Sequence, residues 1–309
     1  MISFRAAGNG SRCIVMIGGG GWPTTGRNPG SKGRAVEVEV AVIPAAGRGT
    51  RMRPATRALP KAMLPIVDRP AIQWVVEEAA RAGAREIFVI VDPGVGVLIE
   101  RHFNSQEEGP LAGLEHVNVH PIVQDVPRGL GDAVRTAATA VGNQPFFTLL
   151  VDNLVFPDGD VLPGMAAAAE AGSVVCLREL GTEFLARYGF IVPGEWRNEQ
   201  VVEVLGAIEK PGVEAAPSKL GLIGRYLFTG KIFEALDHVE PGVGGEIQLT
   251  DAIHTVGEAG NCLGYVAADD LLDSGTPSGY LEASTILGAA HPDFGARYRA
   301  FVTEFTEGL

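Results

Sequence analysis

The strongest constraint on the fold is a regular alternation of apolar strands with amphipathic helices from residue 36 onward. EVEVAVIPA has the length and β-branched content of a buried strand. In PAIQWVVEEAARAG, apolar residues recur on one helical face between a leading proline and a closing glycine. EIFVIV, VNVHPIVQ and PFFTLLVDN are further strands, separated by helical segments. Strands that are apolar throughout and alternate with helices predict a parallel sheet covered on both faces.

The second half of the chain has a different pattern. Residues 173–228 are richer in strand, and the C-terminal third predicts helices over 230–238, 245–259, 277–290 and 293–305. We see no internal repeat and no long linker in the sequence. We therefore expect an α/β fold with a Rossmann-like mixed sheet, mainly parallel and flanked by helices, and with a strand-rich second half.

The N-terminal segment differs from the rest. Residues 1–36 are rich in glycine, serine, proline and arginine and have no sustained hydrophobic period. Their apolar piece, CIVMI, is too short for the core of a signal peptide. We expect a disordered tail over 1–36 and a single domain over 37–309.

Charge and cysteine content exclude several classes of protein. The 309-residue chain has a formal net charge of -12, which argues against non-specific binding to nucleic acid or to an anionic membrane. Its apolar runs fall short of the roughly 18–20 residues that a membrane helix needs. Three widely separated cysteines match no metal-ligand spacing and are typical of reduced, buried thiols, so we expect a cytoplasmic protein.

A basic loop stands out against this acidic balance. PAAGRGTRMRPATRALPKAMLP follows the first predicted strand, and ligands of an open parallel sheet bind beyond the carboxyl ends of its strands. The glycines let the backbone approach a ligand, and Arg51 and Lys61 can bind phosphate oxygens. Neither a Walker A loop nor a complete Rossmann fingerprint is present. A nucleotide or sugar-phosphate loop is favoured, with a solvated basic turn as the alternative.

Three acidic residues add to this picture. Asp152 ends the fourth predicted strand and Asp273 lies in LLDSGTP, a turn before a helix. Carboxylate oxygens suit Mg²⁺, although a turn former or a helix cap is the alternative for either residue alone. Glu209 and Lys210, in EKP, offer an acceptor beside a cation, as a sugar phosphate would need. We interpret most of GGEIQLTDAI as core packing.

Together these motifs resemble the sugar-nucleotide pyrophosphorylases, a nucleotidyltransferase family. The family pattern G-x-G-T-R stands at Gly47–Arg51, Pro-x-Thr at Pro54–Thr56 and Lys-x-x-x-Pro at Lys61–Pro65. PATRALPKAMLPIVDRPAIQWVVEEAARAG is similar to the bacterial UTP–glucose-1-phosphate uridylyltransferases, whereas VDNLVF and LDSGTPSGYLEAS lean toward the glucose-1-phosphate thymidylyltransferases. The resemblance implies the nucleotide-diphospho-sugar transferase type of fold. It also implies a nucleotide-binding half over 37–155, a sugar-binding half over 156–290 and a C-terminal helix over 291–309.

The resemblance implies a role for each matching residue. The nucleotide contacts are Ala45, Ala46, Gly47, Gln124, which reads the pyrimidine edge, and Gly129. The sugar hydroxyls meet Gly189 and Glu209, and Lys210 binds the sugar phosphate. Arg51 and Lys61 bind the triphosphate and, with Asp152 and Lys210, form the catalytic set; Asp152 and Asp273 bind Mg²⁺.

The implied reaction transfers UMP from UTP to a sugar 1-phosphate such as glucose 1-phosphate, with Mg²⁺ as cofactor. A thymidylyltransferase that uses dTTP is the first alternative, because Gln124 pairs equally well with uracil and thymine. A non-catalytic sugar-nucleotide sensor is the second. The expected partners are these substrates, without nucleic acid or membrane. A homo-oligomer stays open, because NSQEEGPLAGLEHV is shorter than the helical insertion that the family usually carries there.

Overall fold

The computed structural model describes residues 35–105, 109–156, 159, 161–170, 172–268 and 271–308. Nearly all of the expected N-terminal tail therefore lies outside the described residues. The chain divides into two compact units, one spanning Gly33–Thr285 and one that contains the C-terminal stretch Ile286–Leu309. Within the described ranges, no helix is both long and apolar enough to cross a membrane.

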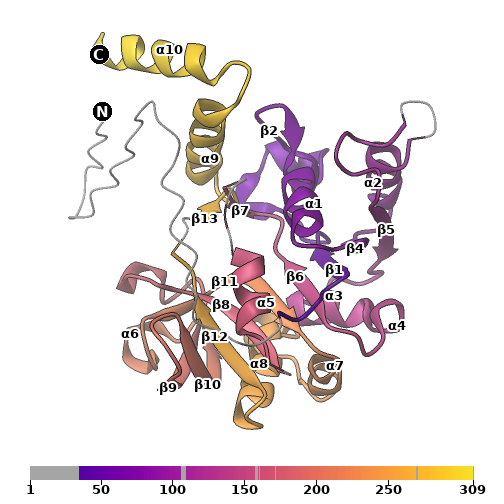
Figure 1. The fold of residues 1–309 in the computed structure, drawn as a ribbon, viewed down its shortest axis with the longest axis vertical. Coiled ribbons are helices and arrows are strands. Elements are labelled where there is room, and N and C mark those ends of the chain that lie inside the picture. The colour runs from indigo at the N-terminus through magenta and orange to yellow at the C-terminus, as the bar shows by residue number, and fades with distance from the viewer. Residues whose placement is uncertain are drawn as a thin grey trace. The chain divides into compact units, whose positions relative to one another are not determined.

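A nine-stranded sheet organises the larger unit (Figure 1). Its strand order is β5-β4-β1-β6-β11-β8-β12-β10-β9. In chain order the strands are β1 Val40–Pro44, β4 Glu86–Val91, β5 Asn118–Val123, β6 Phe146–Leu149, β8 Ser173–Glu179, β9 Gly189–Trp196, β10 Val201–Glu209, β11 Leu220–Phe228 and β12 Cys262–Val266.

The sheet is mixed, which confirms the predicted α/β fold class. Among its described strands, however, neighbours in this order pair parallel and antiparallel equally often, so the expectation of a mainly parallel sheet is wrong. Strands β5, β4, β1 and β6 run parallel to one another. Strand β11 runs antiparallel to β6 and β8, and β10 runs antiparallel to β12 and β9, whereas β8 and β12 are parallel. The first half is parallel because helical crossovers join its strands, while the short link 197–200 lets β9 and β10 form a hairpin.

Helices cover both faces of this sheet (Figure 1). Helices α3, α7 and α8 share one large buried cluster with the strands, and α1 and α5 lie over the other face. The helices of this unit are α1 Ala71–Arg81, α2 Gly96–Phe103, α3 Leu130–Thr136, α4 Ala138–Val141, α5 Val161–Ala168, α6 Gly212–Ala215, α7 Lys231–Leu236 and α8 Leu249–Glu258. Helix α9 spans Pro277–Ala290, and α10, in the C-terminal unit, spans Gly295–Glu307.

The predicted start of helix α8 is wrong. Helix α8 begins at Leu249 rather than at residue 245. Gly244 and Gly245 each have a φ of 74°, a left-handed conformation that a right-handed α-helix cannot continue. The predicted start of the helix therefore falls in a short 3₁₀ turn, Val243–Gly245, a few residues before the stretch 248–250 that belongs to the candidate site.

Two features outside the main sheet position that site. The loop after β1 contains three 3₁₀ turns, Thr50–Met52, Ala55–Arg57 and Lys61–Met63, followed by the short strands β2 Pro65–Ile66 and β3 Arg69–Pro70. A second small sheet pairs β7, Asn153–Val155, with β13, Leu271–Asp273, and sets Asp273 opposite Asn153. Because Asp152 precedes β7 directly, this pairing brings two acids distant in sequence to the same place.

Candidate active site

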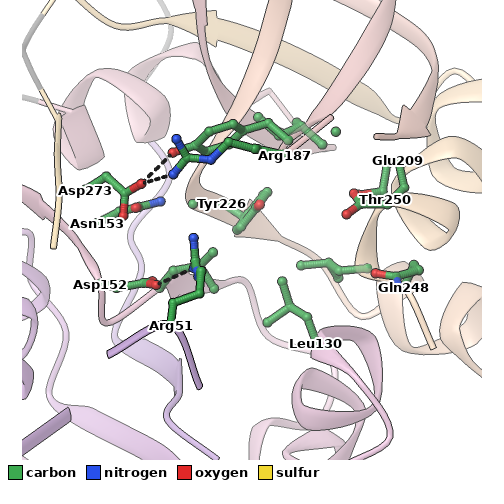
Figure 2. A pocket seen from close by; sticks show the side chains of 16 residues that line it. Arg51, Leu130, Asp152, Asn153, Arg187, Glu209, Tyr226, Gln248, Thr250 and Asp273 are labelled. Carbon is green, nitrogen blue, oxygen red and sulfur yellow. Dashed lines mark hydrogen bonds and ion pairs between the residues drawn. The ribbon is translucent and has the colours of Figure 1, made fainter. Parts of the chain in front are cut away.

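A pocket of about 170 Å³ opens beside the turn that carries Asp152 (Figure 2). Its lining comes from the loop after β1, the start of α3, the turn after β6, β7, the start of β9 with the two residues before it, the end of β10, β11, the start of α8 and β13. The predicted site residues among its lining are Arg51, Asp152, Gly189, Glu209 and Asp273. Side chains from both halves of the sequence therefore face one cavity.

Asp152 lies between two cations. Lys61 Nζ lies 2.6 Å from Asp152 Oδ2 and Arg51 Nη2 lies 3.6 Å from the same oxygen. Burial alone would raise the pKa of the Asp152 carboxyl, but the charges of Lys61 and Arg51 and the hydrogen bond from Lys61 outweigh it and lower that pKa. The carboxylate is therefore ionised at neutral pH, as a metal ligand must be.

Asp273 has a different pair of partners. Arg187 Nη2 donates to its Oδ2 over 2.8 Å, and the Tyr188 hydroxyl donates to the same oxygen over 3.2 Å. The backbone N–H of Gly275 donates to its Oδ1 over 2.9 Å. Burial, followed by the negative charge of Asp273, raises the pKa of Tyr188 to about 12. Tyr188 thus stays a neutral hydrogen-bond donor throughout the physiological range.

The two acids converge on Gly275. A Cβ atom added to this glycine would lie 2.6 Å from Asp152 Oδ2 and 2.9 Å from Asp273 Oδ1. Two carboxylate oxygens that reach the same small space form a donor set suited to Mg²⁺, which takes one or two protein carboxylates and leaves its other positions to water and phosphate. No group of three or more potential metal ligands occurs in the described part of the chain, so phosphate oxygens would have to complete such a site.

Glu209 is the acceptor on the opposite side of the pocket. Thr250 Oγ1 donates to Glu209 Oε2 over 2.7 Å, and Lys210 Nζ lies 2.8 Å from Glu209 Oε1. A Cβ atom on Gly189 would lie only 2.9 Å from Thr250 Oγ1 and 3.1 Å from Glu209 Oε2. The absence of a side chain at Gly189 thus keeps this acceptor accessible. Lys210 is held in a left-handed conformation, with a φ of 46°, and is not part of the pocket lining.

The residues predicted to contact the nucleotide, Ala45, Ala46, Gly47, Gln124 and Gly129, are not among the residues that line the pocket. Ala45 and Ala46 are buried where β1 ends, and the Ala45 N–H donates to the Ile90 carbonyl over 2.7 Å. An added Cβ at Gly47 would meet nothing within 4 Å, so its backbone is open to a ligand. Gly129 has a φ of 109° and packs against the Ile247 backbone, directly before Leu130, which lines the pocket.

Sequence reasoning missed several residues of the pocket. Thr250 is buried, as expected of core packing, but its hydroxyl is bonded to Glu209. Arg187 and Tyr188, which hold Asp273, directly precede the predicted Gly189. Their position next to a predicted site residue is the one feature of the sequence that indicates a role for them. Other unpredicted lining residues are Leu130, Leu150, Asn153, Leu222, Gly224, Tyr226, Gln248 and Leu249.

Comparison with known proteins agrees with this geometry. The family model described as "Nucleotidyl transferase" matches residues 40–289. UTP–glucose-1-phosphate uridylyltransferase 2 of Streptococcus pyogenes serotype M3 is 37% identical over 294 residues, which cover 88% of this chain and 98% of that protein. A UTP–glucose-1-phosphate uridylyltransferase of Streptococcus pyogenes is 36% identical over 293 residues, 88% of this chain and 96% of the relative.

Solved structures give the same result. The crystal structure of UDP-glucose pyrophosphorylase complexed with UDP-glucose superposes with a TM-score of 0.76 at 36% identity, over 82% of this chain and all of that one. The UTP-bound UGPase from Acinetobacter baumannii superposes with the same TM-score of 0.76 at 32% identity, over 86% of this chain and 99% of the other. From these matches and from the arrangement of the pocket, the chain belongs to the nucleotidyl transferase family.

Proposed function

We propose that the protein is a UTP–glucose-1-phosphate uridylyltransferase, which transfers UMP from UTP to glucose 1-phosphate. The observation that carries the proposal is the shared pocket, in which Arg51, Asp152 and Asp273 face Glu209. Charged groups for phosphates lie on one side of this cavity and a hydrogen-bond acceptor for hydroxyls lies on the other. The sequence similarity to enzymes with this name supports the same substrates.

The chemistry is an in-line displacement at phosphorus. An oxygen of the sugar phosphate attacks the α-phosphorus of UTP, a new P–O bond forms, the bond to the β-phosphate breaks and pyrophosphate leaves. Because both reactants are anions, the protein's task is charge neutralisation and alignment. Arg51 and Lys61 are suited to bind the triphosphate, and Lys210 to bind the sugar phosphate. Each such contact contributes about 2–4 kcal/mol at the transition state.

Mg²⁺ is the proposed cofactor, and Asp152 and Asp273 are the residues that would hold it. The support is their approach to a common space beside Gly275. When bound, the ion supplies positive charge to phosphate oxygens. Lys61 and Arg187, the present partners of the two acids, would then be free to turn toward phosphate.

The sugar and the base occupy opposite halves in this proposal. Residues 37–155 would bind the nucleotide through Ala45, Ala46, Gly47, Gln124 and Gly129. Residues 156–290 would bind the sugar through Gly189 and Glu209, and Thr250 orients the Glu209 carboxylate for the sugar hydroxyls. A cytoplasmic location and a disordered tail over 1–36 stay predictions. The location fits the two described cysteines, Cys176 and Cys262, which are buried and outside any disulfide.

Pyrophosphate release from the purified protein tests this function. We expect release with UTP, glucose 1-phosphate and Mg²⁺ together, and none after a chelator is added or with the Asp152→Asn variant. Preference for dTTP over UTP would establish the thymidylyltransferase alternative instead. Binding of UDP-glucose without turnover of any triphosphate and sugar 1-phosphate pair would point to the sensor and overturn the proposal.

A further inference from the structure

We propose that Asp132 sets the base specificity of this enzyme by holding the side-chain amide of Gln124 in one orientation. The inference rests on the proposed function, in which Gln124 reads the pyrimidine. In this inference, Asp132 does not contact the substrate. It is a positioning residue that decides whether Gln124 presents its oxygen or its nitrogen to N3 of the base.

The contact between these residues is short and buried. Gln124 Nε2 donates to Asp132 Oδ2 over 2.6 Å. Gln124 is 4% exposed and Asp132 is 3% exposed. The Gln124 backbone is fixed as well, because its N–H donates to the Val91 carbonyl over 2.9 Å as β5 ends. Hydrogen bonds therefore fix both the backbone and the side-chain amide of Gln124.

The charge of Asp132 makes the orientation unique. An ionised carboxylate can only accept hydrogen bonds, so the amide must turn its NH₂ group toward Asp132. The reversed amide would set Gln124 Oε1 against Asp132 Oδ2, two acceptors in a buried place with no proton between them. An uncharged residue with both donor and acceptor would not impose this choice.

Two arginines keep Asp132 ionised. Arg135 Nη2 lies 2.7 Å and Arg128 Nη2 lies 3.1 Å from Asp132 Oδ1, the oxygen that Gln124 does not use. Burial would raise the pKa of this carboxyl, but the hydrogen bonds from Gln124, Arg135 and Arg128 outweigh it and lower that pKa. The two oxygens of Asp132 thus have separate tasks, one facing the arginines and one facing the amide.

The oxygen of the Gln124 amide is left for a ligand. Within the described residues, Gln124 Oε1 accepts no hydrogen bond. The side-chain atoms of the described residues that are both fully buried and without a hydrogen-bond partner are the hydroxyls of Thr148 and Thr229, so Gln124 Oε1 is not fully buried. Asp132 and Leu130 share the first turn of α3, and Leu130 lines the pocket. Through Asp132, the Gln124 amide is therefore bonded to a helix whose first residue lines the cavity.

This orientation selects among pyrimidines. Uracil and thymine carry a hydrogen on N3, which Gln124 Oε1 can accept, and a neighbouring carbonyl, which can accept the second Nε2 hydrogen. Cytosine carries a lone pair on N3 and would meet the Gln124 oxygen without a proton between them. The same arrangement accepts both UTP and dTTP, so discrimination between those two must come from elsewhere.

The test compares UTP with CTP at saturating glucose 1-phosphate. We expect kcat/KM of the wild-type protein to favour UTP by roughly a hundredfold, and Asp132→Asn to reduce this preference by roughly tenfold or more, because Asn can face Gln124 with either end of its amide. Asp132→Ala, which also removes the carboxylate, should give a similar reduction. Asp237→Asn, an exposed acid on another element, should leave the preference unchanged.

Three results separate the possible failures. A wild-type protein that turns over neither UTP nor dTTP would refute the proposed function. Turnover of UTP, with a UTP-to-CTP preference equal in the wild type, Asp132→Asn and Asp132→Ala, would refute the role of Asp132 alone. If both variants fail to fold, calorimetric titration of the wild-type protein decides, since equal affinity for UTP and CTP would also overturn the inference.

Discussion

Lys61 Nζ lies 2.6 Å from Asp152 Oδ2, although 91 positions separate the two residues in the sequence. In the proposed mechanism Lys61 binds triphosphate and Asp152 holds Mg²⁺, so each neutralises the other until substrates arrive. We expect Lys61→Met to lower kcat/KM for UTP by about 10²–10³, the usual cost of one charge-stabilising donor. The protein should stay folded, because Arg51 still faces Asp152.

Lys219→Met is the matched control for that variant. Lys219 Nζ lies 3.8 Å from Glu179 Oε1, and both side chains are highly exposed. Such a surface ion pair contributes little to the stability of the protein. Steady-state kinetics should give wild-type rates for this protein. A Lys61→Met enzyme with rates equal to those of Lys219→Met would remove Lys61 from the mechanism.

Gly275→Ala should damage the proposed Mg²⁺ site without unfolding the protein. The new methyl group would approach oxygens of both Asp152 and Asp273 to less than 3 Å, which real Cβ atoms do not tolerate. We expect a large loss of turnover and a rise in the Mg²⁺ concentration that gives half-maximal rate, measured by titration after treatment with a chelator. Gly308→Ala, whose methyl would meet only ordinary contacts at 3.6 and 3.7 Å, is the control. An unchanged Mg²⁺ dependence of Gly275→Ala would argue against these two acids as ligands.

The sequence predicted the fold class correctly and offered candidate site residues, but local patterns did not show how those residues meet. The buried strands and the basic loop follow from local patterns, because burial and loop chemistry depend on neighbours in the chain. The meeting of Asp152 and Asp273 depends on the pairing of β7 with β13, which no local pattern encodes. A separation of two acids along the chain says nothing about their distance in space.

Thr250 illustrates the other limit. Its position on an amphipathic helix correctly predicts burial, but a buried threonine becomes part of a site only through its partner. That partner, Glu209, lies 41 positions away and reaches Thr250 because α8 packs on β10. The start of α8 was also missed, since the left-handed backbone of Gly244 and Gly245 is not visible in a hydrophobic pattern.

Thr250→Val should raise KM for glucose 1-phosphate by roughly tenfold. Its hydroxyl donates over 2.7 Å to Glu209, and a hydrogen bond to a charged group is worth about 1.5–3 kcal/mol. Thr250→Ser keeps the donor and should restore most of the affinity. Thr255→Val, in the same helix but bonded to the Asp251 carbonyl at the surface, should leave KM unchanged. Equal KM values for Thr250→Val and Thr250→Ser would mean that this hydrogen bond does not orient Glu209.

Asp132 should also contribute to stability in a pH-dependent way. Its pKa is lowered in the folded protein, so the folded state favours the ionised form relative to the unfolded chain. This contribution is fully present above the unfolded value near 3.9 and is lost as the pH falls through the lower folded value. Thermal unfolding between pH 3 and pH 7 should therefore show a smaller acid-induced decrease in Tm for Asp132→Asn than for the wild type. Parallel curves for the two proteins would contradict this linkage.

Arg225 offers the clearest test of how the Asp152 turn is supported. Its side chain is fully buried, donates to Glu78 over 2.9 and 2.8 Å, and also donates to the carbonyls of Leu150 and Asn153, on either side of Asp152. Arg225→Met leaves Glu78 as an unpaired buried charge, so we expect a loss of about 3–5 kcal/mol in the free energy of unfolding, measured with urea.

The double variant Glu78→Leu/Arg225→Met separates two contributions to the lost stability, the unpaired charge of Glu78 and the loss of the ion pair itself. With both charges removed, most of the lost stability should return, because apolar replacement of a buried pair is often close to neutral. Activity should not return, since the carbonyls of Leu150 and Asn153 would still lack the donor that holds the turn. A double variant that regains both stability and wild-type turnover would show that Arg225 serves only to neutralise Glu78. If the double variant loses as much stability as the single variants Glu78→Leu and Arg225→Met combined, Glu78 and Arg225 are not energetically coupled.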